Sequence, residues 1–116
     1  MEAIRLKILA IDDQPDNLTT LKAVVQDALP RCTLLTALTG QQGIELAKRE
    51  DPDVILLDIV MPEMDGYDVC RQLKSDEKLN SIPVVFLTAL RTDSENRIKA
   101  LEAGAEAFLS KPLDVQ

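Results

Sequence analysis

The chain has 116 residues, of which 46% are hydrophobic and 28% are charged. This composition is typical of one soluble globular domain, because the chain has enough apolar residues for a core and is too short for two ordinary domains. The 13 basic and 20 acidic residues give a net charge of −7, which disfavours direct binding to the backbone of DNA or RNA. No apolar run approaches the ~20 residues of a membrane helix, so we expect no membrane contact.

The residue types that are rare in this sequence also limit its function. It contains no histidine, which excludes a histidine-based triad, a zinc site with imidazole ligands and a histidine phosphocarrier. Its two cysteines, Cys32 and Cys70, show neither metal-ligand spacing nor a CxxC motif. Two reduced thiols are typical of a cytoplasmic protein, and two aspartates interrupt the first apolar run, which disfavours a signal peptide. We therefore expect a cytoplasmic domain.

Short apolar segments alternate with amphipathic segments along the whole chain. Residues 6–11 predict a buried strand, and the stretch from Pro15 to Pro30 predicts a helix. The apolar stripe of this helix is formed by Leu18, Leu21, Val25 and Ala28. The remaining predicted strands are 33–38, 54–57, 84–88 and 107–109, and the remaining predicted helices are 41–50, 67–75 and 93–103. In the last helix we expect Ile98, Leu101 and the following Ala105 to face the core, with Gly104 as the C-cap.

The predicted order of elements is β-α-β-α-β-α-β-α-β. Apolar strands without polar alternation indicate a parallel sheet that is covered by helices on both faces, and each crossover should be right-handed. The predicted fold class is therefore α/β with a doubly wound parallel sheet, in a single domain over residues 1–116. The pattern leaves no residues for a fifth helix, so we expect a domain excised from, or truncated relative to, a longer protein.

Polar and charged residues follow the predicted strands at their carboxyl ends. Asp12 and Asp13 follow the first strand, Asp58 follows the third, Thr88 ends the fourth and Lys111 follows the fifth. In an open parallel sheet, ligands bind at this edge, so we expect these five residues to converge. Each of them alone is more typical of a turn or a helix cap. Their coincidence at the strand ends favours a functional site.

The three carboxylates indicate a hard divalent cation. Clustered carboxylates repel one another, and Mg²⁺, for which Mn²⁺ could substitute, removes that repulsion while accepting oxygen ligands. We expect Asp13 and Asp58 to bind the ion directly and Asp12 to bind it through a water. A carboxylate can also act as a nucleophile toward a phosphoryl donor. Thr88 would then supply a hydrogen bond, and Lys111 a positive charge, to the phosphoryl oxygens.

Four segments carry a family resemblance. The segments ILAIDDQPDN, ILLDIVMPEMDG, IPVVFLTAL and GAEAFLSKPL resemble the signatures of response-regulator receiver domains, and the resemblance covers about residues 6–113. It implies a flavodoxin-like, chemotaxis-regulator-like fold with a five-stranded sheet in the order 2-1-3-4-5, from which this chain lacks the fifth helix. It also implies that Asp58 is the phosphoacceptor, that Asp12 and Asp13 complete the acidic pocket, and that the backbone carbonyl of Val60 is a further metal ligand.

The same resemblance assigns the remaining site residues and the partners. Thr88 corresponds to the switch threonine, Lys111 to the phosphate-binding lysine and Phe108 to the rotating aromatic, although Phe108 could also be a plain core aromatic. The bond from Lys111 to Pro112 resembles one that is usually cis. The implied partners are a histidine kinase or hybrid kinase as phosphodonor and an output domain or downstream protein. The implied catalysis is limited to self-phosphorylation and self-dephosphorylation in two-component signalling.

Three alternative functions remain to be compared with this one. A haloacid-dehalogenase-type phosphatase requires a DxD motif after the first strand, whereas Asp12 and Asp13 are adjacent. A flavodoxin requires a loop rich in Ser, Thr and Gly at that place, and the acids here would repel its phosphate. A receiver domain that binds partners without phosphorylation also remains possible.

Two further expectations concern apolar side chains. Val60 and Leu90 flank the site and cannot orient a water, so the acyl phosphate should hydrolyse slowly. Without a fifth helix, Ile8, Ile55 and Leu109 should be partly uncovered, which predicts a homodimer.

Overall fold

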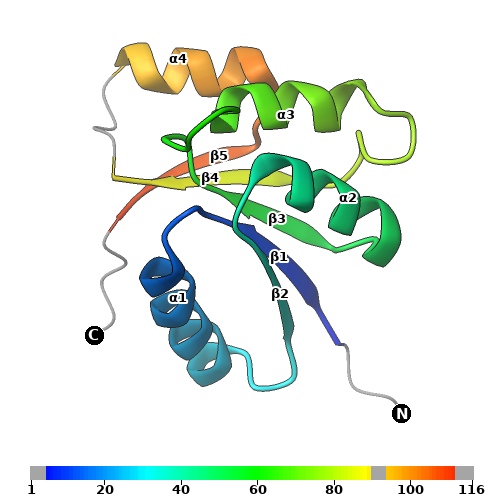
Figure 1. Ribbon diagram of the computed structural model, residues 1–116, viewed down its shortest axis with the longest axis vertical. Coiled ribbons are helices and arrows are strands. Elements are labelled where there is room, and N and C mark those ends of the chain that lie inside the picture. The colour runs from blue at the N-terminus through cyan, green and yellow to red at the C-terminus, as the bar shows by residue number, and fades with distance from the viewer. Residues whose placement is uncertain (1–4, 90–93, 112–116) are drawn as a thin grey trace.

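The computed structural model describes residues 5–89 and 94–111, and its centre is a five-stranded sheet in the order β2-β1-β3-β4-β5 (Figure 1). The strands are β1 (Lys7–Ile11), β2 (Thr33–Ala37), β3 (Val54–Leu57), β4 (Val84–Thr88) and β5 (Ala107–Ser110). The helices are α1 (Pro15–Ala28), α2 (Gly40–Glu50), α3 (Gly66–Ser75) and α4 (Ser94–Ala103). All four strand pairs are parallel. The predicted α/β fold class and strand order are confirmed. No helix follows β5 within the described residues, which end at Lys111.

The helices cover the two faces of the sheet unequally. Figure 1 shows α1 on one face and α2, α3 and α4 on the other. The larger core lies on the three-helix side, where Ile55, Leu57 and Phe86 are completely buried. The smaller core joins β1 to the buried stripe of α1, which consists of Leu18, Leu21 and Val25. The predicted fourth member of this stripe, Ala28, is exposed because it lies at the end of the helix.

Helix starts follow closely after strand ends, and local hydrogen bonds fix them there. The Thr39 hydroxyl accepts a hydrogen bond from the Gln42 backbone at 3.1 Å before α2. The Asp65 carboxylate accepts one from the Asp68 backbone at 2.9 Å before α3. Such side-chain caps satisfy the free N–H groups of a first helical turn. Helix α1 has no side-chain cap, but it begins with Pro15, which fits the first position of a helix.

Helix α4 differs from its prediction in the face that it buries. Ile98 and Leu101, which were predicted to face the core, are 52% and 69% exposed. The buried residues are instead Ala100 and Ala103, because their small side chains allow α4 to approach α3 closely. The predicted Ala105 is buried. The predicted C-cap is confirmed, since Gly104 has a φ of 98° and its N–H donates to the Leu101 carbonyl.

Two of the three side chains expected to be uncovered are in fact buried. Ile8 is 6% exposed, because α1 covers it, and Ile55 is 0% exposed, because it points to the opposite face beneath the other helices. Alternation of side chains along a strand explains this difference, since neighbouring residues point to opposite faces. Leu109 is 47% exposed, as predicted. None of the helices in the described ranges is both long and apolar enough to cross a bilayer.

Candidate functional site

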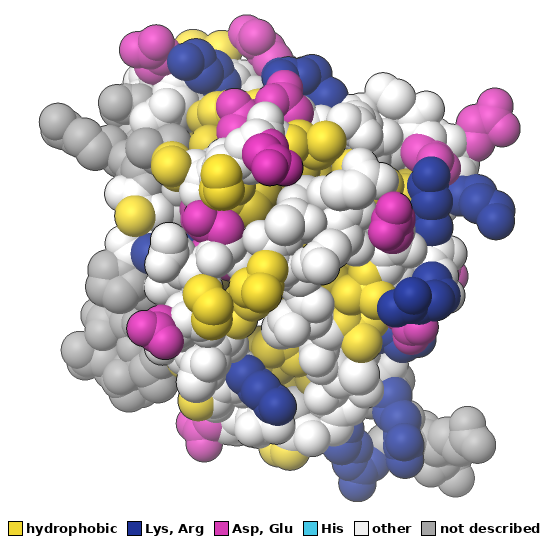
Figure 2. Space-filling model, in the orientation of Figure 1, with side chains coloured by type: hydrophobic (Ala, Val, Ile, Leu, Met, Phe, Trp, Pro, Cys, Tyr) yellow, Lys and Arg dark blue, Asp and Glu magenta, His cyan; other side chains and the backbone are white. Residues whose placement is uncertain are grey.

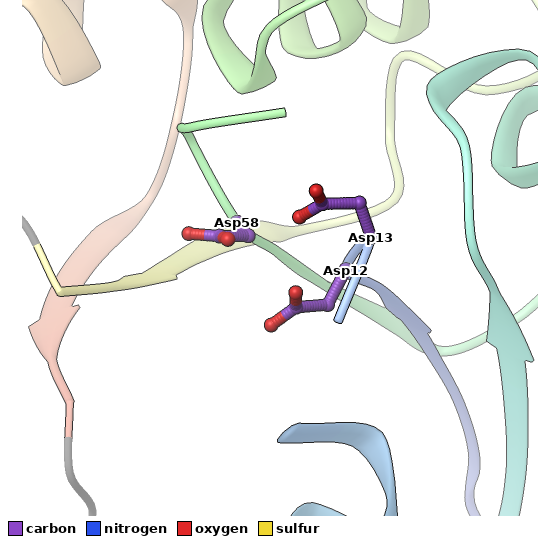
Figure 3. A group of neighbouring side chains, drawn as sticks. All are labelled: Asp12, Asp13 and Asp58. Carbon is purple, nitrogen blue, oxygen red and sulfur yellow. The ribbon is translucent and has the colours of Figure 1, made fainter. Parts of the chain in front are cut away.

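Three carboxylates meet at the carboxyl ends of β1 and β3 (Figure 3). These two strands are paired, with Ile11 opposite Leu57, so the residues that follow them are neighbours. Asp12 and Asp58 are 5% and 7% exposed, and Asp13 is half-buried. One carboxylate oxygen from each aspartate lies within 4.8 Å of the other two. The convergence predicted for the three acids is therefore present in the structure.

Lys111, which follows the edge strand β5, brings a positive charge to the same place. Its Nζ lies 2.5 Å from Oδ2 of Asp12 and 3.6 Å from Oδ2 of Asp58. Its backbone N–H donates to the Thr88 carbonyl at 2.7 Å, which continues the β4–β5 pairing past the end of β5. Thr88 is completely buried, and its side chain makes a hydrogen bond to Asp58. The five predicted site residues thus form one cluster, with the ammonium closer to Asp12 than to Asp58.

Burial raises the pKa of Asp58 above its usual value of 3.8. Lys111 lowers this pKa, the negative charge of Asp12 raises it, and hydrogen bonds from Thr88 and the Ile59 backbone lower it. The net direction is upward, so the positive charge and hydrogen bonds around Asp58 do not fully offset its desolvation. A cluster of three carboxylates with one nearby ammonium is short of positive charge. Oxygen ligands with this spacing suit Mg²⁺, so the residues present fit the predicted ion.

Two other predicted residues lie around this cluster. The side chain of Val60, in the loop after Asp58, is 60% exposed. Phe108 is half-buried on β5, and its ring packs edge-on against Phe86 with 6.3 Å between the centroids. Phe86 in turn packs against Tyr67 at 5.4 Å, so a row of three rings runs from β5 through the buried Phe86 to Tyr67 on α3. Leu90 and Pro112, together with the expected cis bond, lie outside the described residues.

Sequence reasoning missed three residues that contact the aspartates. The Asn17 amide donates to Oδ2 of Asp12 at 3.2 Å, and the Gln14 N–H donates to Oδ1 at 2.9 Å. Gly66 packs so closely on the end of β3 that an added Cβ would lie 2.3 Å from the Asp58 carbonyl oxygen. Asn17 could have been found from its place in the first turn of the helix that follows Asp12. Gly66 carries no comparable signal, since an Asp-Gly pair also marks an ordinary turn.

Comparisons with known proteins identify the family. The model of the response regulator receiver domain matches residues 8–116. Response regulator PleD of Caulobacter vibrioides is 44% identical over 108 residues, which are 93% of this chain and 23% of PleD. The chain therefore spans about a quarter of the length of this relative.

Solved structures agree with this assignment. The chemotaxis protein CheY4 of Vibrio cholerae superposes with a TM-score of 0.87 at 27% identity, over 96% of this chain and 90% of CheY4. The receiver domain of sensor histidine kinase PA1611 from Pseudomonas aeruginosa, with a magnesium ion coordinated in its active-site cleft, has a TM-score of 0.83 at 29% identity. That alignment covers 96% of this chain and 88% of the PA1611 domain. The chain belongs to the response regulator receiver domain family, and it is a signalling domain of a two-component system. The family resemblance seen in the sequence is confirmed.

Proposed function

We propose that this domain is a phosphoacceptor switch, in which Asp58 receives a phosphoryl group from a histidine kinase or hybrid kinase in a Mg²⁺-dependent reaction. The observation that carries the proposal is the convergence of Asp12, Asp13 and Asp58, with oxygen atoms within 4.8 Å of one another, beside the ammonium of Lys111. Strand ends that are far apart in sequence supply all four groups. The family membership supports the same assignment.

In the proposed reaction, a carboxylate oxygen of Asp58 attacks the phosphorus of the donor's phosphohistidine. An O–P bond forms while the N–P bond breaks, and the leaving imidazole nitrogen keeps the electron pair. Lys111 is 3.6 Å from Asp58, which is close enough for its ammonium to turn toward the incoming phosphoryl oxygens. Thr88 already makes a hydrogen bond to Asp58 and would redirect its hydroxyl to a phosphoryl oxygen. The domain would accept and lose this group itself but would turn over no metabolite.

The metal ion would be held by Asp12, Asp13, Asp58 and the backbone carbonyl of Val60. Mg²⁺, or Mn²⁺ in its place, would offset the negative charge of the carboxylates and the phosphoryl group. The upward shift in the pKa of Asp58 supports this role, because it reflects a buried carboxylate short of positive charge. The magnesium ion in the PA1611 receiver domain supports it by similarity.

The signal would leave the site through β4, β5 and α4. Thr88 and Phe108 lie on the paired strands β4 and β5, and Phe108 borders a surface pocket together with Leu101 of α4. The exposed apolar side chains of this region are Ile98, Leu101 and Leu109. Figure 2 shows acidic and basic side chains close together over α4, with apolar side chains between them. A rearrangement of Thr88 and Phe108 would change this surface. We expect an output domain, a downstream protein or a second copy of the chain to bind there.

Phosphorylation with a small-molecule donor tests the proposal. The purified domain is incubated with acetyl phosphate, with and without Mg²⁺, and its mass is measured intact. We expect one added phosphoryl group in the presence of Mg²⁺, loss of this product in Asp58→Asn, and much slower formation in Asp13→Asn. Asp27→Asn, at an exposed position on α1, is the matched control and should behave like the wild type. Equal phosphorylation of wild type and Asp58→Asn would contradict the proposal, as would formation that does not depend on Mg²⁺.

A further inference from the structure

Asp12 is held at the site through both of its carboxylate oxygens. Its side chain is almost fully buried, and both of its oxygens accept hydrogen bonds. Oδ1 accepts from the backbone N–H of Gln14 at 2.9 Å. Oδ2 is shared by two donors, the Lys111 ammonium at 2.5 Å and the Asn17 amide at 3.2 Å. One of these two donors is charged and belongs to the proposed reaction, whereas the other is neutral and has no assigned role.

The position of Asn17 follows from the way α1 begins. The helix starts at Pro15, so Asn17 is the third residue of its first turn and lies over the end of β1. Side chains on a helix lean toward its N-terminus, which directs the Asn17 amide back to Asp12. The backbone N–H of Asn17 also donates to the Gln14 carbonyl at 3.0 Å, and this bond fixes the first turn. The amide is therefore presented to Asp12 by the hydrogen-bonded first turn of α1.

Asn17 and Lys111 reach Asp12 from the same side. A cavity of about 20 Å³, room for about one water molecule, is bordered by Asn17, Asp12, Asp58 and Lys111. In the proposed reaction, Lys111 leaves Asp12 for the phosphoryl group. Asp12 would then lose its strongest partner while it still has to face the metal ion. A neutral donor that remains in place would keep the carboxylate oriented during this exchange, and it would not compete with the cation.

We propose that Asn17 is a positioning residue that acts through Asp12 and strengthens metal binding at the acidic site. This inference rests on the proposed function, because it requires the same ion. Groups that orient a metal ligand typically change metal affinity by ~10–100-fold. The bond here is 3.2 Å long and Asn17 is half-exposed, so we expect an effect below this range or at its lower limit, about 3- to 10-fold.

The test is a double-mutant cycle on Mg²⁺ affinity, measured from the shift of the melting temperature with Mg²⁺ concentration. Asn17→Ala should raise the Kd for Mg²⁺ by about 3- to 10-fold in the otherwise wild-type chain. In the Asp12→Ala background, the same substitution should leave the Kd unchanged, because its target is absent. Gln26→Ala, at an exposed position of the same helix, controls for the loss of a polar side chain and should not change the Kd.

A second readout separates positioning from a purely structural role. The Mg²⁺ concentration that half-saturates phosphorylation by acetyl phosphate should rise by the same factor in Asn17→Ala, whereas the melting temperature without Mg²⁺ should stay close to that of wild type. An unchanged Kd in Asn17→Ala, or an equal change in the Asp12→Ala background, would overturn the positioning role while wild-type phosphorylation stays intact. A wild-type chain that neither binds Mg²⁺ nor accepts phosphoryl would overturn both this inference and the proposed function.

Discussion

Gly66 connects the start of α3 to the backbone of the proposed phosphoacceptor, and Gly66→Ala should damage both stability and phosphorylation. An added Cβ would lie 2.3 Å from the Asp58 carbonyl oxygen and 2.7 Å from Cα of Ile59. Both are backbone atoms, so no side chain can rotate away. To reach even 3.0 Å from the carbonyl oxygen, α3 and the end of β3 must separate by about 0.7 Å. The Gly66 N–H also donates to the Ile59 carbonyl at 2.8 Å, and this bond would be strained.

The expected loss can be estimated from two opposing effects. Overpacking of a buried position costs about 1–3 kcal/mol, and the upper part of this range applies because only backbone atoms can move. Alanine favours a helix by up to ~1 kcal/mol over glycine, which offsets part of the cost. The free energy of unfolding should therefore fall by roughly 2 kcal/mol, which lowers the melting temperature by about 10 °C. Urea unfolding measures the first quantity and calorimetry measures the second.

Phosphorylation of the folded fraction distinguishes this account from general destabilisation. Asp58 moves with the end of β3, so Gly66→Ala should accept phosphoryl from acetyl phosphate more slowly even where it is fully folded. Gly43→Ala is the matched control, because the nearest atoms to its added Cβ all belong to the Ile11 side chain. It should lose stability but retain phosphorylation. The reasoning is refuted if Gly66→Ala unfolds within ~0.5 kcal/mol of the wild type and is phosphorylated at the same rate.

Three further predictions concern other parts of the domain. Burial alone would raise the pKa of Glu106, but hydrogen bonds from Lys74 and the Val84 backbone lower this pKa below 4.5. The ionised Glu106 therefore stabilises the folded state above pH 4.5, and this contribution is lost as the pH falls through the lowered pKa. Glu106→Gln should thus cost up to about 1 kcal/mol of unfolding free energy at pH 7, and this cost should shrink as the pH falls below 4.5 and through the lowered pKa; a cost that does not change with pH would contradict this. Val60→Asn, unlike Val60→Ala, should shorten the lifetime of the acyl phosphate several-fold by orienting a water, and decay of the wild type within seconds would refute the premise. Leu101→Lys should reduce self-association in analytical ultracentrifugation whereas Leu38→Lys should not, and a strictly monomeric wild type would exclude the homodimer.

Local sequence patterns predicted the five strands and the convergence of five residues at one edge of the sheet. Strands β1 and β3 end directly before Asp12 and Asp58, β4 ends at Thr88, and β5 ends directly before Lys111. The parallel arrangement brings these ends to one edge of the sheet. The pairing of β1 with β3 then determines that Asp12 and Asp58 are neighbours. The strand order itself came from the family resemblance, since alternation of elements alone does not define it.

The hydrogen bonds within the site could not be predicted in this way. Lys111 is separated from Asp12 by 99 residues, and its choice of Asp12 over Asp58 depends on where β5 ends relative to β1. The contact between Asn17 and Asp12 depends on how the first turn of α1 is placed over the strand. Both contacts depend on the exact positions of side-chain atoms, whereas a sequence pattern only assigns a residue to a helix, strand or loop.

The orientation of α4 shows a different limit of sequence patterns. Its sequence offers two apolar stripes, one with the large side chains of Ile98 and Leu101 and one with Ala100 and Ala103. A hydrophobicity pattern favours the large side chains, because they gain more on burial. Packing against α3 instead favours burial of the two alanines. Cys70 on α3 is completely buried, and its Sγ donates to the Ala103 carbonyl at 3.3 Å, an approach that only small residues on α4 allow. The large side chains are thereby left on the surface beside β5, where binding to another protein would bury them.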